Sequence, residues 1–184
     1  MPKEAKLKRT KHGLVPSGRG WFVVNAMKAR WWRSKRFGRT CVFEGNERFP
    51  HLGVNLSILE PGQPNCMYHR ESDQEDFLVL AGRCRLLIDE REVPLKAWDF
   101  VHCPPGTNHV FVGAGSGPCA ILMMGARRPG TTLTYPASPL ARRYGASVAK
   151  RTHSPTVAYR DSPRWLSTKG RWPVPRGSGD RESG

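Results

Sequence analysis

The sequence predicts an all-β fold, a barrel or sandwich built as one domain. Short runs rich in apolar and β-branched residues recur from about residue 53 to residue 125, with turn residues between them roughly every 8 to 12 positions. The segment GVNLSILE at 53–60 alternates between two faces, as a half-buried strand does. A chain of 184 residues is long enough for one domain with a core and too short for two to be assumed.

Strands are expected wherever an apolar run lies between two turns. In chain order they are 53–60, a strand through Tyr68 and His69, 76–80, 84–88, 100–103, 110–112 and 119–124, after an earlier β-rich run that begins at 21–24. We expect a polar turn at 89–92. The glycine-rich segment 113–117 is expected to be a hairpin loop and not a dinucleotide fingerprint, because a strand and not a helix follows it.

The two ends of the chain differ from this segment in composition. Residues 1–20 are rich in Lys, Gly and Pro without a hydrophobic period, which predicts a basic, flexible N-terminal arm. The barrel is expected at 21–125, with its motif core at 53–125. The C-terminal extension, 126–184, is expected to hold short helices opened by Ser138-Pro139 and Ser154-Pro155. A Pro-, Gly- and Arg-rich tail follows, in which Trp165 and Trp172 are expected to pack onto the barrel.

The net charge of +15 belongs to the flanks. Residues 1–48 hold 13 Lys/Arg against 3 Asp/Glu and residues 126–184 hold 12 against 3, whereas residues 49–125 hold 5 against 9. Such flanks can bind phosphate backbones by releasing counterions, and Trp31 and Trp32 lie among arginines where they could stack on bases. No nucleic-acid-binding motif accompanies the charge, and solubilising tails would look the same.

Several classes of protein are disfavoured. No stretch of 18 apolar residues is present, so no membrane-spanning helix is expected. The basic N-terminus lacks the apolar region and cleavage site of a secretory signal, and we expect a cytoplasmic protein without a membrane partner. The cysteines are odd in number, scattered and without a C-x-x-C pair, which favours free thiols packed in the core. They are Cys41, Cys66, Cys84, Cys103 and Cys119.

Two segments hold the residues that can perform chemistry. In the first, His69 and Glu71 are two apart on an expected strand and so project to the same side, and Glu75 follows four residues later. In the second, His109 comes just after the rigid turn 104–106, Pro-Pro-Gly. Imidazoles and carboxylates are ligands of divalent transition metals.

Together these segments resemble the two signature motifs of the cupin superfamily, G-x5-H-x-H-x3/4-E-x6-G and G-x5-P-x-G-x2-H-x3-N. Glu75 and Gly82 have the six-residue gap of the first motif, and Pro104, Gly106 and His109 have the spacing of the second. The resemblance implies a double-stranded β-helix, the cupin or jelly-roll barrel, with short helices and basic extensions at both termini.

The first motif can be aligned with the sequence in two registers, and three positions depart from the family pattern. If three residues separate the second histidine of the motif from Glu75, the two histidine positions fall on His69 and Glu71. If four residues separate them, the two positions fall on Tyr68 and Arg70, and neither residue suits a metal. The first register is preferred. The departures are that Gly62 lies one residue too far upstream, Trp98 replaces the opening glycine of the second motif, and Gly113 takes the place of its asparagine.

The resemblance implies a divalent metal ion, Fe, Mn, Ni or Zn, in the barrel interior. Its implied ligands are His69, Glu71, Glu75 and His109. The residues expected beside the metal or around a substrate pocket are Tyr68, Gln74, His102 and Phe111, of which His102 could shuttle a proton or could be purely structural. No catalytic residue is assigned.

The sequence is compatible with three functions. The first is a metal-dependent enzyme of isomerase or dioxygenase type acting on a small polar or anionic metabolite. The alternative is a non-catalytic cupin module that binds a small molecule, and the second alternative is a nucleic-acid-associated protein that binds through its basic arms. The fold alone cannot choose among them, because cupins serve many functions. From the resemblance we also expect a homodimer.

Overall fold

The structure is a computed structural model that describes residues 1–172. Its strands are β1 (Lys6–Thr10), β2 (Gly13–Ser17), β3 (Arg30–Ser34), β4 (Gly38–Val42), β5 (Leu52–Leu59), β6 (Arg70–Glu71), β7 (Glu75–Ala81), β8 (Arg83–Ile88), β9 (Arg91–Lys96), β10 (Phe100–Cys103), β11 (His109–Ala114), β12 (Cys119–Ala126), β13 (Leu133–Thr134) and β14 (Leu166–Lys169). Its helices are the 3₁₀ turn η1 (Ala26–Lys28), α1 (Pro139–Arg142) and α2 (Pro155–Ala158).

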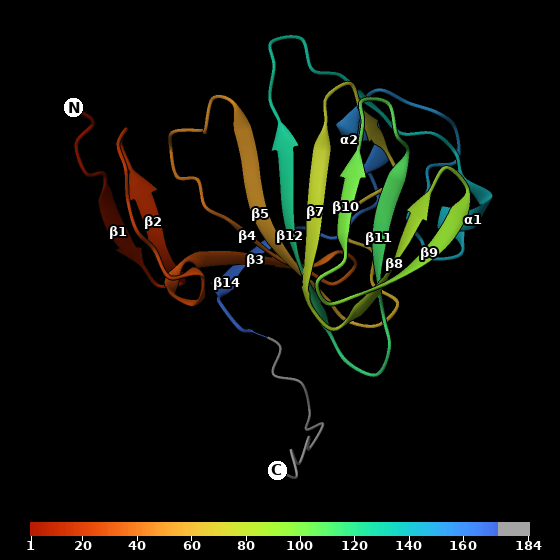
Figure 1. The fold of residues 1–184 in the computed structure, drawn as a ribbon, viewed down its shortest axis with the longest axis horizontal. Coiled ribbons are helices and arrows are strands. Elements are labelled where there is room, and N and C mark those ends of the chain that lie inside the picture. The colour runs from red at the N-terminus through yellow and green to blue at the C-terminus, as the bar shows by residue number, and fades with distance from the viewer. Residues whose placement is uncertain (173–184) are drawn as a thin grey trace.

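Two sheets form the barrel (Figure 1). The larger has the order β10-β7-β12-β5-β4-β3-β14, the smaller has the order β11-β8-β9, and the strand pairs in both are antiparallel. Short two-stranded pairs, β1-β2 and β13-β6, complete the strands. The predicted all-β fold with short helices is confirmed.

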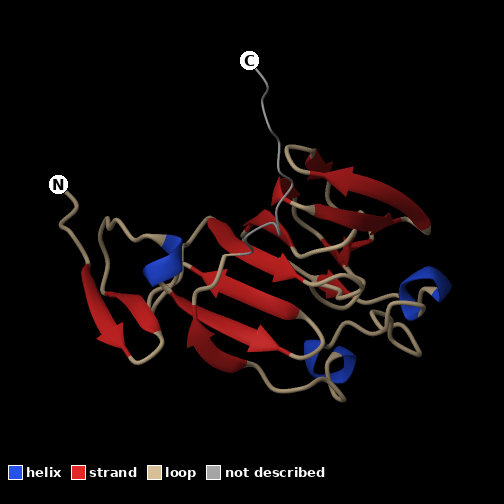
Figure 2. Ribbon diagram, turned by 90° about the horizontal axis from the view of Figure 1, so that it is seen from below, coloured by secondary structure: helices blue, strands red, loops and turns tan. Residues whose placement is uncertain are grey.

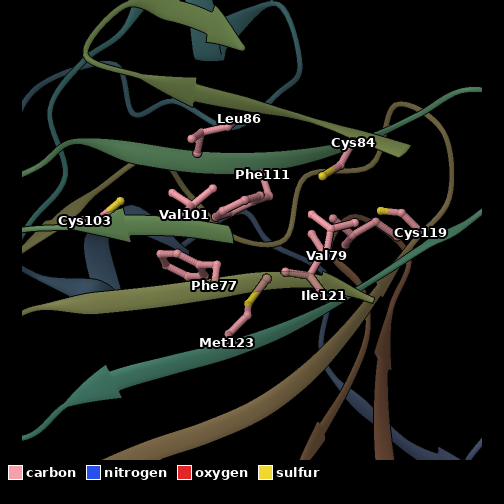
Figure 3. Close-up of a cluster of buried hydrophobic side chains, with 11 residues drawn as sticks. Phe77, Val79, Cys84, Leu86, Val101, Cys103, Phe111, Cys119, Ile121 and Met123 are labelled. Carbon is pink, nitrogen blue, oxygen red and sulfur yellow. The ribbon is translucent and has the colours of Figure 1, made fainter. Parts of the chain in front are cut away.

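Side chains from both sheets fill the interior of the barrel (Figure 3). Phe77, Val79 and Ile121 project from the larger sheet against Leu86 and Phe111 of the smaller one. Burying large apolar side chains stabilises the fold by about 1.5 to 3 kcal/mol each. The interior is therefore a packed core and not an open channel along most of its length.

The cysteines are all free thiols, and four of the five are buried, as their scattered positions predicted. Cys84 and Cys119 belong to different sheets, and both pack into the same hydrophobic core (Figure 3). Cys66 is the exception, because it is only partly buried.

The central strand β5 is buried on both faces, although its alternation predicted a half-buried strand. Ser57 and Leu59 face the barrel interior, where the Ser57 hydroxyl lies 3.5 Å from the Met123 sulfur. Leu56 and Ile58 point outward and are covered by an additional layer that contains Trp31. The alternation correctly separated the two faces, but it could not reveal that residues before the barrel core cover the outer one.

Four local expectations were wrong. The expected strand through Tyr68 and His69 is absent: His69 makes only an isolated bridge, and the strand begins at Arg70. The segment 91–96 is a strand, and the polar turn is confined to Asp89 and Glu90, which both have positive φ. The run at 21–24 forms only a bridge between Trp21 and Glu4, and the strands of that region are β3 and β4. The loop 115–118 is not a hairpin loop, because β11 and β12 lie in different sheets and the loop connects them.

Within the N-terminal arm the structure contains the hairpin β1-β2, where the sequence showed no hydrophobic period. Most of β1 is exposed, so its pairing needs no alternating pattern. The turn is held by Thr10, whose hydroxyl donates to the Gly13 carbonyl and accepts from the His12 N–H. The hairpin lies apart from the barrel, on the far side of η1 (Figure 2).

The C-terminal extension wraps around the barrel. The Ser138 and Ser154 hydroxyls cap α1 and α2, as the cap-then-proline order predicted. Strand β14 pairs with β3, and the Trp165 ring stacks on Phe37 at 6.3 Å. The final residues, 173–184, lie outside the described part of the chain. None of the described helices has the length and apolar character needed to cross a membrane.

Candidate metal centre

The two candidate histidines are direct neighbours across a backbone bridge. The His69 N–H donates to the His109 carbonyl at 3.2 Å, and the His109 N–H donates to the His69 carbonyl at 2.8 Å. Residues that oppose each other in this way carry their side chains on the same face. The two imidazole rings therefore lie close, with centroids 4.9 Å apart.

Glu75, the first residue of β7, brings a carboxylate to the same point. Its Oε2 lies 3.4 Å from the Nε2 atom of His109 and 4.0 Å from that of His69. One ligand atom from each of these three residues lies within 4.8 Å of the others. His69 and His109 are buried, and Glu75 is mostly buried.

Backbone carbonyls fix which nitrogen of each histidine faces the cluster. The Nδ1 atom of His69 lies 2.9 Å from the Met67 carbonyl, and the Nδ1 atom of His109 lies 3.1 Å from the Thr107 carbonyl. A carbonyl only accepts hydrogen bonds, so each Nδ1 carries the proton and donates it. Both Nε2 atoms then present a lone pair toward Glu75, which is the usual arrangement of metal-binding histidines.

Burial disfavours charge on all three groups when no metal is bound. It lowers the pKa of His69 to about 3, with a further contribution from neighbouring His109, and it lowers the pKa of His109 to about 4. Burial, together with the charge of Glu71, raises the pKa of Glu75 to about 8. A bound divalent cation would place a positive charge beside Glu75 and so favour the ionised form of its carboxylate.

The donor set fits such a cation. Two neutral imidazoles and one carboxylate suit borderline transition metals such as Fe(II), Mn(II), Ni(II) and Zn(II), and three protein ligands leave coordination positions open. The three residues are a candidate metal site, and the identity of the metal is not determined by them.

The structure does not bring Glu71 into this group, although it lies two residues from His69. The alternation rule applies along a continuous strand, and here the chain changes partner: His69 bridges to β11, whereas Arg70 and Glu71 pair with β13. Glu71 stays near enough to raise the pKa of Glu75 through its charge. Its own pKa is raised by burial and by Asp73.

Three of the four residues expected around the metal lie elsewhere. Tyr68 is buried under α1, and its hydroxyl accepts the Glu90 N–H. Gln74 and His102 both contact Asp76 on the outside of the barrel, where the His102 Nδ1 atom lies 2.7 Å from the carboxylate.

The fourth, Phe111, lies in the interior beside the cluster. Its ring centroid is 6.4 Å from that of His109, and Phe77 fills the space between at 5.1 Å from His109. The two phenylalanine rings therefore form the core side of the site.

The sequence did not predict two residues that lie beside the site. The Cys66 sulfur lies 3.6 Å from the Nδ1 atom of His69, and the Tyr135 ring lies 5.9 Å from the His69 ring. The sequence predicted that Cys66 is a packing residue, and Tyr135 belongs to the C-terminal extension after the barrel. No spacing pattern connects either residue with His69, so only the tertiary structure reveals them.

A family model for the cupin domain matches residues 55–125, a segment that includes all three residues of the cluster. Residues 55–125 are therefore a cupin domain, and the barrel of two antiparallel sheets is the double-stranded β-helix of that family. The resemblance on which the sequence analysis relied is confirmed. No curated protein is similar enough to this chain to count as a match.

The chain is similar to solved structures from several organisms. The polyketide cyclase RemF from Streptomyces resistomycificus is 15% identical with a TM-score of 0.51, over 60% of this chain and 83% of that one. A sugar phosphate isomerase from a cupin superfamily, from Silicibacter pomeroyi, is 29% identical with a TM-score of 0.47, over 59% of this chain and 66% of that one. This chain thus spans about two thirds of the isomerase. A cupin 2 domain-containing protein from Halorhodospira halophila is 18% identical with a TM-score of 0.45, over 65% and 90%.

Proposed function

We propose that this protein is a metal-dependent cupin enzyme that acts on a small polar metabolite at the site formed by His69, Glu75 and His109. The observation that carries the proposal is the convergence of two Nε2 lone pairs and one carboxylate at a buried point, with both imidazoles held by backbone carbonyls. A site whose ligands are positioned before the metal arrives loses little entropy on binding it.

The surroundings limit what can reach the metal. Phe77, Phe111 and the packed core close the inner side, so a substrate would approach from another side. Oxygen atoms of the substrate would take the open coordination positions.

The protein residues have separate tasks in this proposal. His69 and His109 hold the ion through Nε2, and Glu75 neutralises part of its charge. Glu71 is the candidate for exchanging a proton with a substrate hydroxyl, because its charge contributes to the raised pKa of Glu75 and burial raises its own pKa. A bound metal would supply Lewis-acid polarisation of a carbonyl or hydroxyl, or reactivity toward oxygen if it is iron.

Elemental analysis of protein purified without chelators tests the metal site. We expect about one equivalent of Fe, Mn, Ni or Zn per wild-type chain, and its loss in His69→Ala and His109→Ala. The matched control is His102→Ala, which removes an exposed histidine from the outside of the same barrel. Wild-type protein that takes up none of the four ions on titration, or a control that loses metal equally, contradicts the site.

Turnover is tested with the metal-loaded protein. Small hydroxy acids, oxo acids and phosphorylated sugars are supplied with and without oxygen, and substrate loss is followed by mass spectrometry. We expect conversion of at least one compound, abolished by Glu75→Gln. Binding without conversion in the loaded wild type would instead assign the protein to the non-catalytic ligand-binding cupins.

A further inference from the structure

A second cavity, of about 840 Å³, lies at the end of the barrel remote from His69. We propose that it binds a nucleotide-like ligand, a small molecule that carries phosphate groups and a flat aromatic ring. Three arginines, Arg39, Arg83 and Arg171, line it together with Trp172. This site is separate from the candidate metal centre and does not depend on the function proposed there.

The strand directions establish the separation of the two sites. β7 begins at Glu75 of the metal centre and ends at Ala81 of the cavity, and β11 begins at His109 and ends at Ala114. Strands rise about 3.3 Å per residue, so the sites lie about 15 to 20 Å apart. The core side chains of Figure 3 fill the barrel between them.

The charge of the cavity favours an anion. Three arginines line it against one acidic residue, Glu60. The arginine ion pairs found in residues 1–172 all involve other arginines, so none of the three is neutralised by a carboxylate there. Arginines gathered without acidic partners repel one another, and a phosphate group relieves that repulsion while accepting two hydrogen bonds from each guanidinium fork.

The three arginines come from parts of the chain that are far apart in sequence. Arg39 belongs to β4 and Arg83 opens β8, whereas Arg171 follows β14. The connection between β11 and β12, at the bottom of the barrel in Figure 1, forms another wall with Gly115, whose positive φ lets the chain turn against the Arg83 stem. Arginines that converge from distant parts of the chain indicate a binding site more specifically than a run of basic residues along a tail does.

The aromatic wall points to the ring of the ligand. Trp172 lines the cavity and is 36% exposed, so part of its indole is accessible to a ligand ring. Gly170 holds this segment close to the barrel, because a Cβ at that position would lie 2.7 Å from both the Met27 carbonyl oxygen and the Trp31 indole nitrogen. Stacking of a base on an aromatic side chain contributes about 1 to 3 kcal/mol.

Isothermal titration of the full chain with ADP, without added metal, tests the proposal. We expect saturable binding that weakens as salt rises, and at least tenfold weaker binding in Arg39→Gln/Arg83→Gln. The matched control, Arg9→Gln/Arg164→Gln, removes two exposed arginines outside the cavity and is expected to bind like the wild type. His69→Ala is also expected to bind ADP unchanged, which separates this site from the metal centre.

A second set of titrations tests the role of the Trp172 ring. Trp172→Ala is expected to weaken binding of ADP several-fold and to leave binding of inorganic pyrophosphate unchanged. The proposal fails if ADP does not bind at low salt, if both arginine pairs weaken binding equally, or if Trp172→Ala binds ADP like the wild type. Thermal melts of each variant establish that it is folded.

Discussion

At the scale of single residues, the same arrangement occurs twice in the metal centre. Met67 and Thr107 each lie two residues before a histidine, and each accepts the Nδ1–H of that histidine. Because the acceptors are backbone carbonyls, the orientation of the imidazoles depends on the strand geometry and not on a neighbouring side chain. The sequence pattern could nominate both histidines, but it could not state which nitrogen would bind a metal.

An ion pair outside the site makes a prediction about pH. Burial by itself would raise the pKa of Glu44, but hydrogen bonds from Arg127 and the Phe49 N–H, and the charges of Arg127 and Arg48, hold it below its usual value. A depressed carboxyl pKa adds stability above the pKa of the unfolded chain, and this stability is lost as pH falls through the folded pKa. We expect Glu44→Gln to lower the free energy of unfolding at pH 7 by about 1 to 2 kcal/mol.

Denaturant unfolding at several pH values measures this difference. The gap between wild type and Glu44→Gln is expected to be constant from pH 7 down to about pH 5 and to close below the ordinary pKa of a glutamate, near 4.5. Glu47→Gln is the matched control, since its partner Arg19 is almost fully exposed. A gap that widens as pH falls would contradict the assigned sign.

At the scale of elements, strand order determines where the loops lead. β11 and β12 are consecutive but belong to different sheets, so the segment between them crosses from one sheet to the other. The turn residues Gly115 and Gly117 were visible in the sequence. The partners of the flanking strands were not, because pairing is decided by contacts with β8, β5 and β7.

The crossing requires a close approach at Gly113, near the end of β11. A Cβ there would lie 2.2 Å from the Glu60 carbonyl oxygen, a backbone atom that cannot easily move aside. We expect Gly113→Ala to reduce the free energy of unfolding by about 1 to 3 kcal/mol. Gly117→Ala is the control, because nothing lies within 4 Å of a Cβ at that position.

Chemical denaturation of the two variants tests this prediction side by side. A Gly113→Ala protein as stable as Gly117→Ala would show that the connection does not approach the Glu60 backbone so closely. The position is also the one where the second cupin motif has asparagine, so the chain departs from the motif at a place where a side chain would meet the backbone of Glu60.

At the scale of the whole molecule, the barrel core is covered by segments before and after it. Trp31 of β3 is fully buried over the outer face of β5, and its indole N–H donates to the Ala26 carbonyl at 2.8 Å. β14, from the end of the described chain, pairs with the same strand β3. The flanks are thus part of the structure, and their basic residues remain on the surface around them.

Trp31→Ala tests whether this outer layer stabilises the fold. Removing a buried tryptophan leaves a cavity and is expected to cost about 3 to 5 kcal/mol in the free energy of unfolding. Trp32→Ala is the matched control: its side chain lies on the opposite face of the strand, where Arg30 covers it at 4.9 Å. Equal melting temperatures for the two variants would contradict a structural role for the layer.

The sequence by itself determined the fold class, most barrel strands, both helix caps, and the three residues of the candidate metal site, His69, Glu75 and His109. All of these depend on neighbours within a few positions, through side-chain alternation, turn chemistry and motif spacing. The tertiary structure alone decided that Glu71 is not part of the cluster, that Cys66 and Tyr135 approach it, and that three arginines distant in sequence line one cavity at the other end. Those outcomes depend on which strands pair and where the chain changes partner, and hydrogen bonds between distant backbone segments leave no periodic trace in the sequence.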